Sequence, residues 1–406
     1  MGRQKKVAGD DIFAEIAAET GGEVVGQADK ASQYFIDTGC LAINYCCSGR
    51  FIRGGIPGGR LTEIYGPSAS SKSLIGTNLL FGCQKLGGIP VLIDSENAVN
   101  KDFIKKASHA DLNRILRYTP ETLEDCFHTM YRVIDKIRSK PGYEDKPLVI
   151  VYDSISVSPC KREFRETDLP EDFTKEQFKK IVGGNEQPGE RAKICSKELR
   201  KLNTVMEEAN VSVVIMNQIR DKIGVMYGNP ETTAGGGNAL PFYASLRFRT
   251  QTQKKIEEKV TGLAKKKSIG INLKIQNKKN RSVRPFIEVE NIPLFFEKGI
   301  NPLGGLLGAL LDADRIAASG AGNFKVKPEF AGNPEVEYKF KSSMERNDVP
   351  MQVLFDNPKL IDAETADEIR EYLEPFMGAI EASDDPGVEA FDVSDSDDEE
   401  LDSILG

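Results

Sequence analysis

The stretch that decides the fold runs from residue 61 to residue 85 and reads LTEIYGPSASSKSLIGTNLLFGCQK. The apolar run at 61–65 has the composition of a buried strand, and the helical pattern that begins at Lys72 continues to Lys85. Between them lies the loop 66–73. A strand, a loop ending in Lys-Ser and a helix are typical of a phosphate-binding loop, because the loop amides and the helix N-terminus then point at the phosphates.

The loop predicts a site for ATP and Mg²⁺. In the pattern G-x-x-x-x-G-K-[ST], Lys72 reaches the β and γ oxygens and Ser73 places its hydroxyl on the metal. One position departs from this pattern, because Ser71 stands where the second glycine is expected. The alternative is a serine-rich helix cap that binds no nucleotide. The predicted nucleotide-binding residues of the loop are Gly66, Pro67, Ser68, Ala69, Ser70, Ser71, Lys72 and Ser73.

Two carboxylates follow other predicted strands. Asp153 ends the apolar run PLVIVYD, where a carboxylate can hold the magnesium ion and its water shell. Glu96 closes the run VLIDSE and can orient and deprotonate the water that attacks the γ-phosphate. Asp94 lies two residues earlier and shares a face with Glu96 in an extended strand. Taken alone, each of these acids can also be a turn cap or a solvated surface acid.

The wider pattern predicts an α/β fold with a mostly parallel central sheet covered on both faces, because apolar strand runs alternate with helical runs. The expected strands are 61–65, 89–94, 147–153 and 211–216, and the expected helices are 72–85, 121–137 and 190–209. From Ser245 the pattern changes to alternating strands, SLRFRTQ, IGINLKIQN and PFIEVEN. These favour antiparallel additions to one edge of the sheet.

Four segments are expected along the chain. Residues 1–32 hold a short amphipathic helix and a linker; such a helix is marginal alone, so we expect it to pack on a neighbouring protomer. Residues 33–299 form the core, and residues 300–378 form a small C-terminal α/β domain. Residues 379–406 are acidic and poor in apolar residues, which predicts a disordered tail.

The net charge of the 406 residues is −8, but it is unevenly placed. Residues 381–406 carry 11 acidic and no basic groups, while the rest holds 54 basic and 51 acidic groups, a net of +3. The body is therefore compatible with nucleic acid. No apolar run is long enough for a membrane span, and the start lacks a secretory signal. Seven cysteines without a CxxC pair, and two histidines, argue against a disulfide framework or a zinc site, so a cytoplasmic location is expected.

A resemblance to a known family rests on longer stretches. Residues 217–250, NQIRDKIGVMYGNPETTAGGGNALPFYASLRFRT, closely resemble the second DNA-binding loop of RecA recombinases and the strand that follows it. GGIPGGRLTEIYGPSASSKS resembles the family's approach to its phosphate loop, and VLIDSENAV its catalytic-glutamate strand. The resemblance implies a RecA-type P-loop ATPase core. Ser71, the glycine run 235–237 and the long segment after Ser158 depart from the bacterial pattern and favour a divergent or phage-borne, UvsX-type relative.

The resemblance also implies roles around the nucleotide. Glu96 matches the general base, and Gln218 matches the glutamine that senses the γ-phosphate and relays its presence to the DNA loop. Phe103 falls where an aromatic stacks on adenine, and Asn100 stands where an aspartate is usual. With Lys72, the implied catalytic residues include a basic pair that reaches the neighbouring protomer's γ-phosphate. That pair is Lys279 and Arg281, with the register open by a residue or two and a basic hairpin tip as the alternative.

DNA binding needs cations along the backbone and apolar groups that separate bases. Ile223 matches the family residue that wedges between base triplets. Lys193 and Arg200 match helix positions that touch the DNA backbone, although a basic helix face is more often only solvated. Further contacts are expected from residues 161–189. The predicted DNA-binding residues are Lys193, Arg200, Arg220, Lys222, Ile223, Met226, Gly235, Gly236, Gly237 and Asn238.

Together these features predict an ATP-dependent homologous recombination protein, active in DNA repair, that forms helical filaments on single-stranded DNA and exchanges strands with DNA-stimulated ATP hydrolysis. Its expected partners are single-stranded and duplex DNA and further copies of itself. The resemblance also allows a single-strand-binding protein or a loader as a partner. No membrane partner is expected. Two alternatives stay open: a RecA-fold hexameric helicase or motor, and a filament-forming DNA-binding protein with weak or lost ATPase activity.

Overall fold

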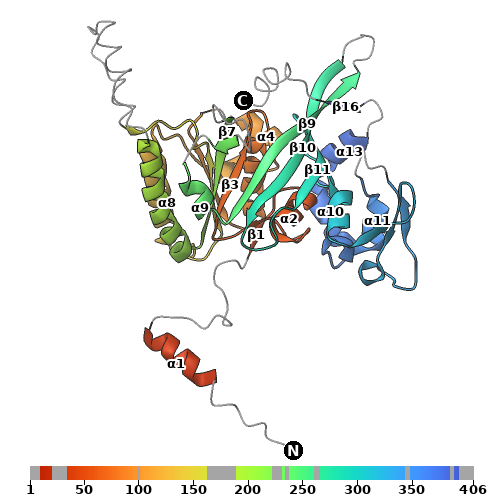
Figure 1. Ribbon diagram of the computed structural model, residues 1–406, viewed down its shortest axis with the longest axis horizontal. Helices are drawn as coiled ribbons and strands as arrows, with labels where there is room; N and C mark the ends of the chain where they lie inside the picture. Colours follow the sequence, from red (N-terminus) through yellow and green to blue (C-terminus); the bar gives the residue numbers. More distant parts are fainter. Residues whose placement is uncertain are drawn as a thin grey trace, which may run out of the picture.

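The computed structural model describes residues 10–20, 34–97, 101–161, 189–221, 231–233, 237–259, 266–342, 348–384 and 388–392. Figure 1 shows a large sheet with helices on both faces and, beside the antiparallel end of the sheet, a smaller unit drawn in blue. Helix α1, Asp10–Thr20, lies apart from both.

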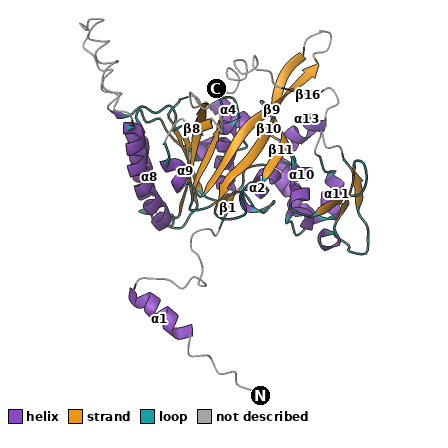
Figure 2. Cartoon of the chain, in the orientation of Figure 1, coloured by secondary structure: helices purple, strands orange, loops and turns teal. Residues whose placement is uncertain are grey.

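Eleven strands of the described residues form one sheet (Figure 2). They are β3 Leu61–Gly66, β4 Ile89–Asp94, β5 Leu116–Tyr118, β6 Leu148–Asp153, β7 Val211–Asp221, β8 Glu231–Thr233, β9 Leu246–Lys259, β10 Lys266–Asn280, β11 Glu288–Phe295, β12 Gly299–Ile300 and β16 Val388–Asp392. The order is β12-β11-β10-β9-β3-β7-β6-β4-β5, with β8 paired to β7 and β16 to β9. Pairing is parallel from β9 to β5 and antiparallel from β9 to β12. The expected α/β class and the antiparallel addition are thus confirmed.

Helices cover both faces of the parallel part. On one face lie α2, Leu41–Ser48, and α3, Lys72–Lys85. On the other lie α5, Leu123–Arg138, α8, Glu190–Ala209, and α9, Ala239–Tyr243. Side chains along each strand alternate between the two faces, so each strand contributes to both apolar layers. In β3, for example, Leu61 packs on the side of α8 and Ile64 on the side of α3. The sheet is therefore buried on two sides, as its uninterrupted apolar strands require.

The predicted bounds of α3 and α8 agree with the structure, whereas α2 and β5 were not predicted. In α8 the buried residues recur at helical spacing, at Cys195, Leu199, Leu202 and Met206. All eight residues of α2 are buried, so it has no polar face that would reveal its period. Strand β5 is only three residues long and its side chains are exposed, so it lacks an apolar signal.

The remaining elements surround the sheet. Two-residue strands β1, Phe35–Ile36, and β2, Ile56–Pro57, pair beside it, and α4, Lys101–Ala107, follows β4. The smaller unit contains α10 Leu306–Asp312, β13 Ile316–Ala318, β14 Asn323–Val326, β15 Lys339–Lys341, α11 Met351–Asp356, α12 Ala366–Leu373 and α13 Met377–Asp384. Its three strands form a separate antiparallel sheet. This mixture of helices and strands matches the small α/β unit that the sequence predicts there.

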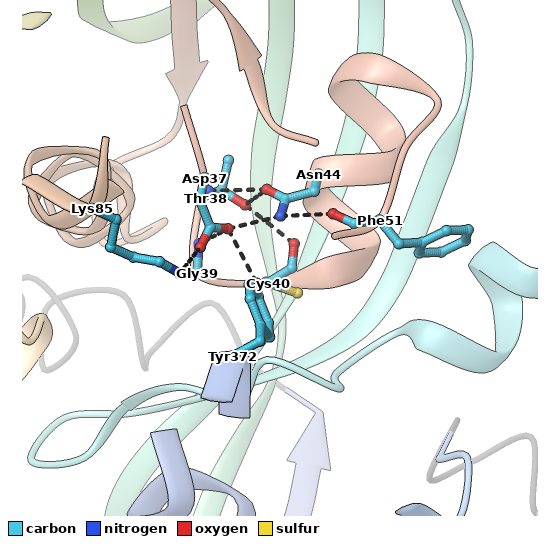
Figure 3. A network of polar contacts seen from close by, with 8 residues as sticks. All are labelled: Asp37, Thr38, Gly39, Cys40, Asn44, Phe51, Lys85 and Tyr372. Carbon is cyan, nitrogen blue, oxygen red and sulfur yellow. Dashed lines mark hydrogen bonds and ion pairs between the residues drawn. The ribbon is translucent and has the colours of Figure 1, made fainter. Parts of the chain in front are cut away.

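A polar network around Asp37 ties this unit to the core (Figure 3). Lys85 at the end of α3 forms an ion pair with Asp37 at 2.8 Å, and Asn44 of α2 donates to the same carboxylate at 2.7 Å. Tyr372 of α12 donates its hydroxyl to Asp37 at 3.1 Å. The Lys85 ammonium also lies 4.6 Å from the centre of the Tyr372 ring. One carboxylate therefore connects the helix that follows the phosphate loop with the C-terminal unit.

The expectation that residues 379–406 are disordered is wrong for part of that range. Helix α13 continues to Asp384, and its Ala379 and Ala382 are buried against Phe295. Strand β16 then pairs antiparallel with β9, from Val388 opposite Glu258 to Asp392 opposite Lys254. The edge of β9 beyond the end of β3 offers unpaired backbone groups, and the short segment VEAFD can pair with it although the tail around this segment is acidic.

All seven cysteines are free thiols and all are buried. Ile12, Phe13 and Ile16 on the predicted apolar face of α1 are more than half exposed. Within the described ranges, no helix combines the length and the apolar character that a membrane crossing needs.

Candidate functional site

Four parallel strands end at one edge of the sheet, and this edge gathers the predicted nucleotide-site residues. In the pairing of β3 with β7, Gly66 stands opposite Gln218. In the pairing of β4 with β6, Asp94 stands opposite Asp153. Glu96 follows β4 by two residues. Residues that are distant in the sequence therefore converge at the carboxyl ends of the strands, where ligands bind in open α/β sheets.

The loop 66–73 leads from β3 into α3 as predicted. Ser70 Oγ donates to the Pro67 carbonyl at 2.8 Å and lies 2.7 Å from Thr250 Oγ1, which ties the loop to β9. Lys72 is buried, and its ammonium donates to the Pro67 carbonyl and, at 3.3 Å, to Ser70 Oγ. The Lys72 ammonium group therefore lies within the loop, hydrogen-bonded to the loop's own residues.

Ser71 occupies the position where the loop pattern has glycine. It precedes the first residue of α3 with φ 59° and ψ 28°, in the left-handed region that glycine enters without strain. Its side chain makes no cap hydrogen bond, and within the described residues its Oγ is buried without a partner. The alternative of a serine-rich helix cap therefore lacks the contact it requires.

Asp153 is buried among charged neighbours. Burial is the main reason that the pKa of its carboxyl is raised to about 7. The negative charges of Glu96 and Asp94 also raise this pKa, whereas Ser73 and the positive charge of Lys72 lower it. Ser154, the next residue, donates its hydroxyl to Glu96 Oε1 at 2.5 Å. Asp153, which ends β6, and Glu96, which follows β4, therefore share one electrostatic environment, and Ser154 holds Glu96 through its hydroxyl.

The residues present fit Mg²⁺ bound together with a phosphate. Among the described residues no group of three or more His, Cys, Asp or Glu side chains could cage an ion. Asp153 and Ser73, however, lie close enough for Ser73 to lower the pKa of the Asp153 carboxyl. Mg²⁺ is usually held by one or two protein oxygens together with substrate phosphates and water, and this pair supplies such oxygens.

Arg117 of β5 is a residue at this edge that the sequence did not single out. Its guanidinium forms an ion pair with the fully buried Asp94 at 2.7 Å and donates to Asn97 Oδ1 at 2.9 Å. It thus binds residues on both sides of Glu96 in the chain. In the sequence, only the short strand-like run LRY followed by Thr-Pro indicates a strand at Arg117. That this strand pairs with β4, and so brings Arg117 to Asp94, is seen only in the structure.

The predicted basic pair lies together at α9. Lys279 donates its ammonium to the carbonyls of Pro241 (2.8 Å) and Phe242 (2.9 Å), and Arg281 donates to the Phe242 carbonyl at 3.3 Å. Burial lowers the pKa of Lys279, and the nearby Arg281 and Arg247 lower it further. Both cations therefore meet the C-terminal end of the helix that follows the glycine run, where carbonyl groups favour positive charge.

The residues predicted to contact DNA are only partly described. Lys193 and Arg200 are exposed on α8, where Lys201 pairs with Glu198 at 3.3 Å. Arg220 lies in β7, which returns through β8 as a hairpin. Gly237 has φ 54°, and Asn238 is exposed before α9. Phe103 lies in α4. Outside the described residues lie Asn100, Lys222, Ile223, Met226, Gly235, Gly236 and nearly all of 161–189.

Comparison with known proteins gives one consistent result. The family model described as the RecA N-terminal domain matches residues 13–301. The chain is 31% identical to "Protein RecA" of Thermus aquaticus over 324 residues, which cover 79% of this chain and 85% of the relative. It is 30% identical over 365 residues to that of Methylobacterium sp. (strain 4-46), covering 86% and 90%. For Deinococcus radiodurans the values are 30% over 328 residues, covering 78% and 81%.

Proposed function

This chain belongs to the RecA family, and from that membership we propose how its own residues carry out the family's reaction. The protein is a DNA-dependent ATPase that serves homologous recombination and strand exchange. It uses a nucleotide, binds DNA and assembles with copies of itself. The observation that carries the assignment is the meeting of the loop 66–73, Glu96, Asp153 and Gln218 at one sheet edge.

The nucleotide is proposed to be ATP with Mg²⁺. Lys72 and the amides of the loop 66–73 would hold the phosphates. Ser73 and Asp153 would hold the magnesium ion, whose chemistry when bound is to neutralise charge on phosphate oxygens. The effect of Ser73 on the pKa of Asp153 supports this role, because it shows that the two side chains are close neighbours. Phe103 and Asn100 are proposed to contact the adenosine.

Glu96 is proposed to accept the proton of the attacking water. The Ser154 hydroxyl donates to Glu96 Oε1 and leaves Oε2 for that water. Gln218, half-buried where the pairing of β7 with β3 ends, would bind the γ-phosphate and report its presence to the loop that follows β7. Gly66 opposite Gln218 in the strand pairing supports this, since the sensor strand and the phosphate loop are direct neighbours.

Lys279 and Arg281 are proposed to complete the site of the next protomer in a helical filament. Their contact with the end of α9 supports a link to DNA, because α9 begins directly after the glycine run of the second DNA loop. The exposed apolar face of α1 would pack on a neighbouring protomer in the same filament. Residues 33–299 would form the ATPase and DNA-binding core, and residues 300–378, with the rest of α13 to Asp384, the small C-terminal domain.

The DNA path is proposed to run from the exposed cations of α8 to the second loop. Lys193 and Arg200 would contact phosphates, and the predicted loop residues Arg220, Lys222, Ile223 and Met226 would contact phosphates and bases. Gly235, Gly236, Gly237 and Asn238 would let the backbone approach the strand. Single-stranded and duplex DNA are the proposed ligands, and a single-strand-binding protein or a loader is a proposed partner.

An ATPase assay with and without single-stranded DNA tests the assignment. Turnover should rise with DNA; Lys72→Ala should lose nucleotide affinity, and Glu96→Gln should bind ATP but turn it over about 100-fold or more slowly. Lys140→Ala, a change at an exposed lysine, is the control and should match the wild type. Electron micrographs of the same samples should show helical filaments. Closed rings would support a hexameric motor instead, and unchanged turnover in Glu96→Gln would contradict the proposed base.

A further inference from the structure

Glu63 is a buried carboxylate in the middle of β3, three residues before the phosphate loop. Its exposed fraction is 0%. Two side chains from neighbouring strands donate to it: Asn217 Nδ2 of β7 reaches Glu63 Oε1 at 2.9 Å, and Arg247 Nε of β9 forms an ion pair with Glu63 Oε2. We call Glu63, Asn217 and Arg247 the Glu63 bridge. A buried charge is unfavourable unless it is paired and hydrogen-bonded, and these two contacts satisfy that requirement.

The strand order places the Glu63 bridge between two parts of the proposed site. Strand β3 lies between β7 and β9, with Glu63 opposite Arg247 in one pairing and Tyr65 opposite Asn217 in the other. The Arg247 guanidinium also lies 4.7 Å from the centre of the Tyr65 ring. Side-chain contacts therefore link β3, β7 and β9 in addition to their backbone hydrogen bonds. These contacts lie shortly before the residues of the proposed site.

On the β7 side, the bridge holds the backbone next to Gln218. Successive side chains of a strand point to opposite faces, so Asn217 and Gln218 face opposite ways. Asn217 is fully buried on the Glu63 side of the sheet. Fixing Asn217 therefore limits how Gln218 can move along or rotate about the strand, without occupying the face that Gln218 uses.

On the β9 side, the bridge adjoins the proposed trans pair. Arg247 stands opposite Lys279 in the β9–β10 pairing, and Lys279 holds the end of α9 together with Arg281. Arg247 and Glu63 both act on the charge of Lys279, the first unfavourably and the second favourably. Glu63 thus offsets the repulsion among three cations that meet at this point.

We propose that the Glu63 bridge is a positioning unit that keeps Gln218 and the Lys279–Arg281 pair in a fixed relation, so that stimulation of ATP turnover by DNA depends on the contacts of the Glu63 carboxylate with Asn217 and Arg247. The inference rests on the proposed function, because Gln218 and the basic pair take their roles from it. Glu63 itself contacts neither nucleotide nor DNA. Its loss should therefore affect the coupling between DNA and hydrolysis and leave nucleotide affinity unaffected.

The test uses the full chain and the variant Glu63→Gln, which keeps the size of the side chain and removes its charge. Nucleotide Kd, the ratio of turnover with and without single-stranded DNA, and stability to urea are measured together. We expect a Kd within about twofold of wild type and a stimulation ratio lowered about tenfold, which corresponds to about 1.4 kcal/mol of lost coupling. Glu207→Gln, the same change at an exposed position of α8, is the matched control and should behave as wild type.

A second variant separates positioning from simple stability. Glu63→Gln leaves Arg247 without its charged partner, so the double variant with Arg247→Met should regain stability. If the bridge positions the site, the double variant stays poorly stimulated despite that recovery. A wild-type ratio in Glu63→Gln overturns the proposal, as does a double variant that regains stimulation together with stability. Absence of stimulation in the wild type would instead overturn the proposed function.

Discussion

At the nucleotide site, the cation of the phosphate loop comes from the loop's own stretch of chain, whereas the nearby carboxylates are paired with arginines from other strands. Lys72 and Ser73 follow from a local pattern, because the loop and the helix after it are contiguous in the chain. The contacts that set the charge of the site are not local: Arg117 reaches Asp94, and Arg247 reaches Glu63 across 184 residues. Such pairs depend on strand order, which a single sequence does not specify. Ser71 was identified as a departure, and its strained backbone was found only in the structure.

Ser71→Gly should stabilise the nucleotide-free protein. The left-handed conformation costs a serine about 1–2 kcal/mol, and part of the relief is offset by the greater freedom of glycine in the unfolded chain. We expect a gain of about 0.5–1 kcal/mol in the free energy of unfolding, measured by urea denaturation. Ser70→Gly, next to it, should lose stability, because Ser70 hydrogen-bonds Pro67 and Thr250. A less stable Ser71→Gly would show that the loop tolerates serine without strain.

Asp153 should make the stability of the nucleotide-free protein depend on pH. Its pKa is raised from 3.8 in the unfolded chain to about 7 in the fold, so between these values the folded state binds the extra proton. The stabilisation is complete below about pH 4 and is lost as the pH rises through 7, amounting to a few kcal/mol. Urea unfolding at pH 5 and pH 8 without Mg²⁺ should show this loss in wild type but not in Asp153→Asn. Parallel behaviour of the two proteins would refute the assignment.

At the scale of elements, periodic patterns were sufficient where an element has two distinct faces. Helices α3 and α8 were predicted to their end residues, whereas the wholly buried α2 and the short edge strand β5 carry no such pattern. Strand β16 is a different case. Only two of its five residues, Glu389 and Asp392, are acidic, but the segment is too short for a clear pattern, and it forms a strand because it meets the free edge of β9, which belongs to another part of the chain.

Removing β16 should expose that edge. A chain ending at Asp384 keeps α13, whose Ala382 is buried, but leaves one edge of β9 without a partner beyond the end of β3, while the other edge stays paired with β10. We expect faster amide hydrogen exchange at 254–258 and more self-association by light scattering than in a chain ending at Asp392, which retains the strand. Equal exchange in the two truncated proteins would mean that β16 does not protect β9.

At the scale of the whole molecule, charge is divided between a weakly basic body and an acidic end. The overall charge of −8 therefore says little about the surface that faces DNA. Residues 393–406 carry six acidic groups, and no basic ones, beyond β16. Because β16 pairs with a strand that contains Lys254 and Lys255, this acidic end starts beside basic residues, and its charge should compete with DNA phosphates.

A chain ending at Asp392 should therefore bind duplex DNA more tightly. We expect the gain to be several-fold at 50 mM salt and to shrink at 200 mM, since both the competition and the binding are electrostatic. Fluorescence anisotropy with a labelled duplex measures the affinity at both salt concentrations. A second version of the full chain, in which the six acids are changed to their amides, should reproduce the effect. If only the truncation does so, length and not charge is responsible.

Because every native thiol is buried, the protein's own cysteines should not react with thiol-specific labels. Burial raises the pKa of Cys40, Cys46 and Cys83 to about 12, so these thiols stay protonated and shielded from alkylating reagents. A single cysteine introduced at an exposed position, such as Glu207 on α8, would then be the one group that a maleimide dye reaches. Energy transfer between dyes on neighbouring subunits could follow assembly on DNA without first replacing seven native residues.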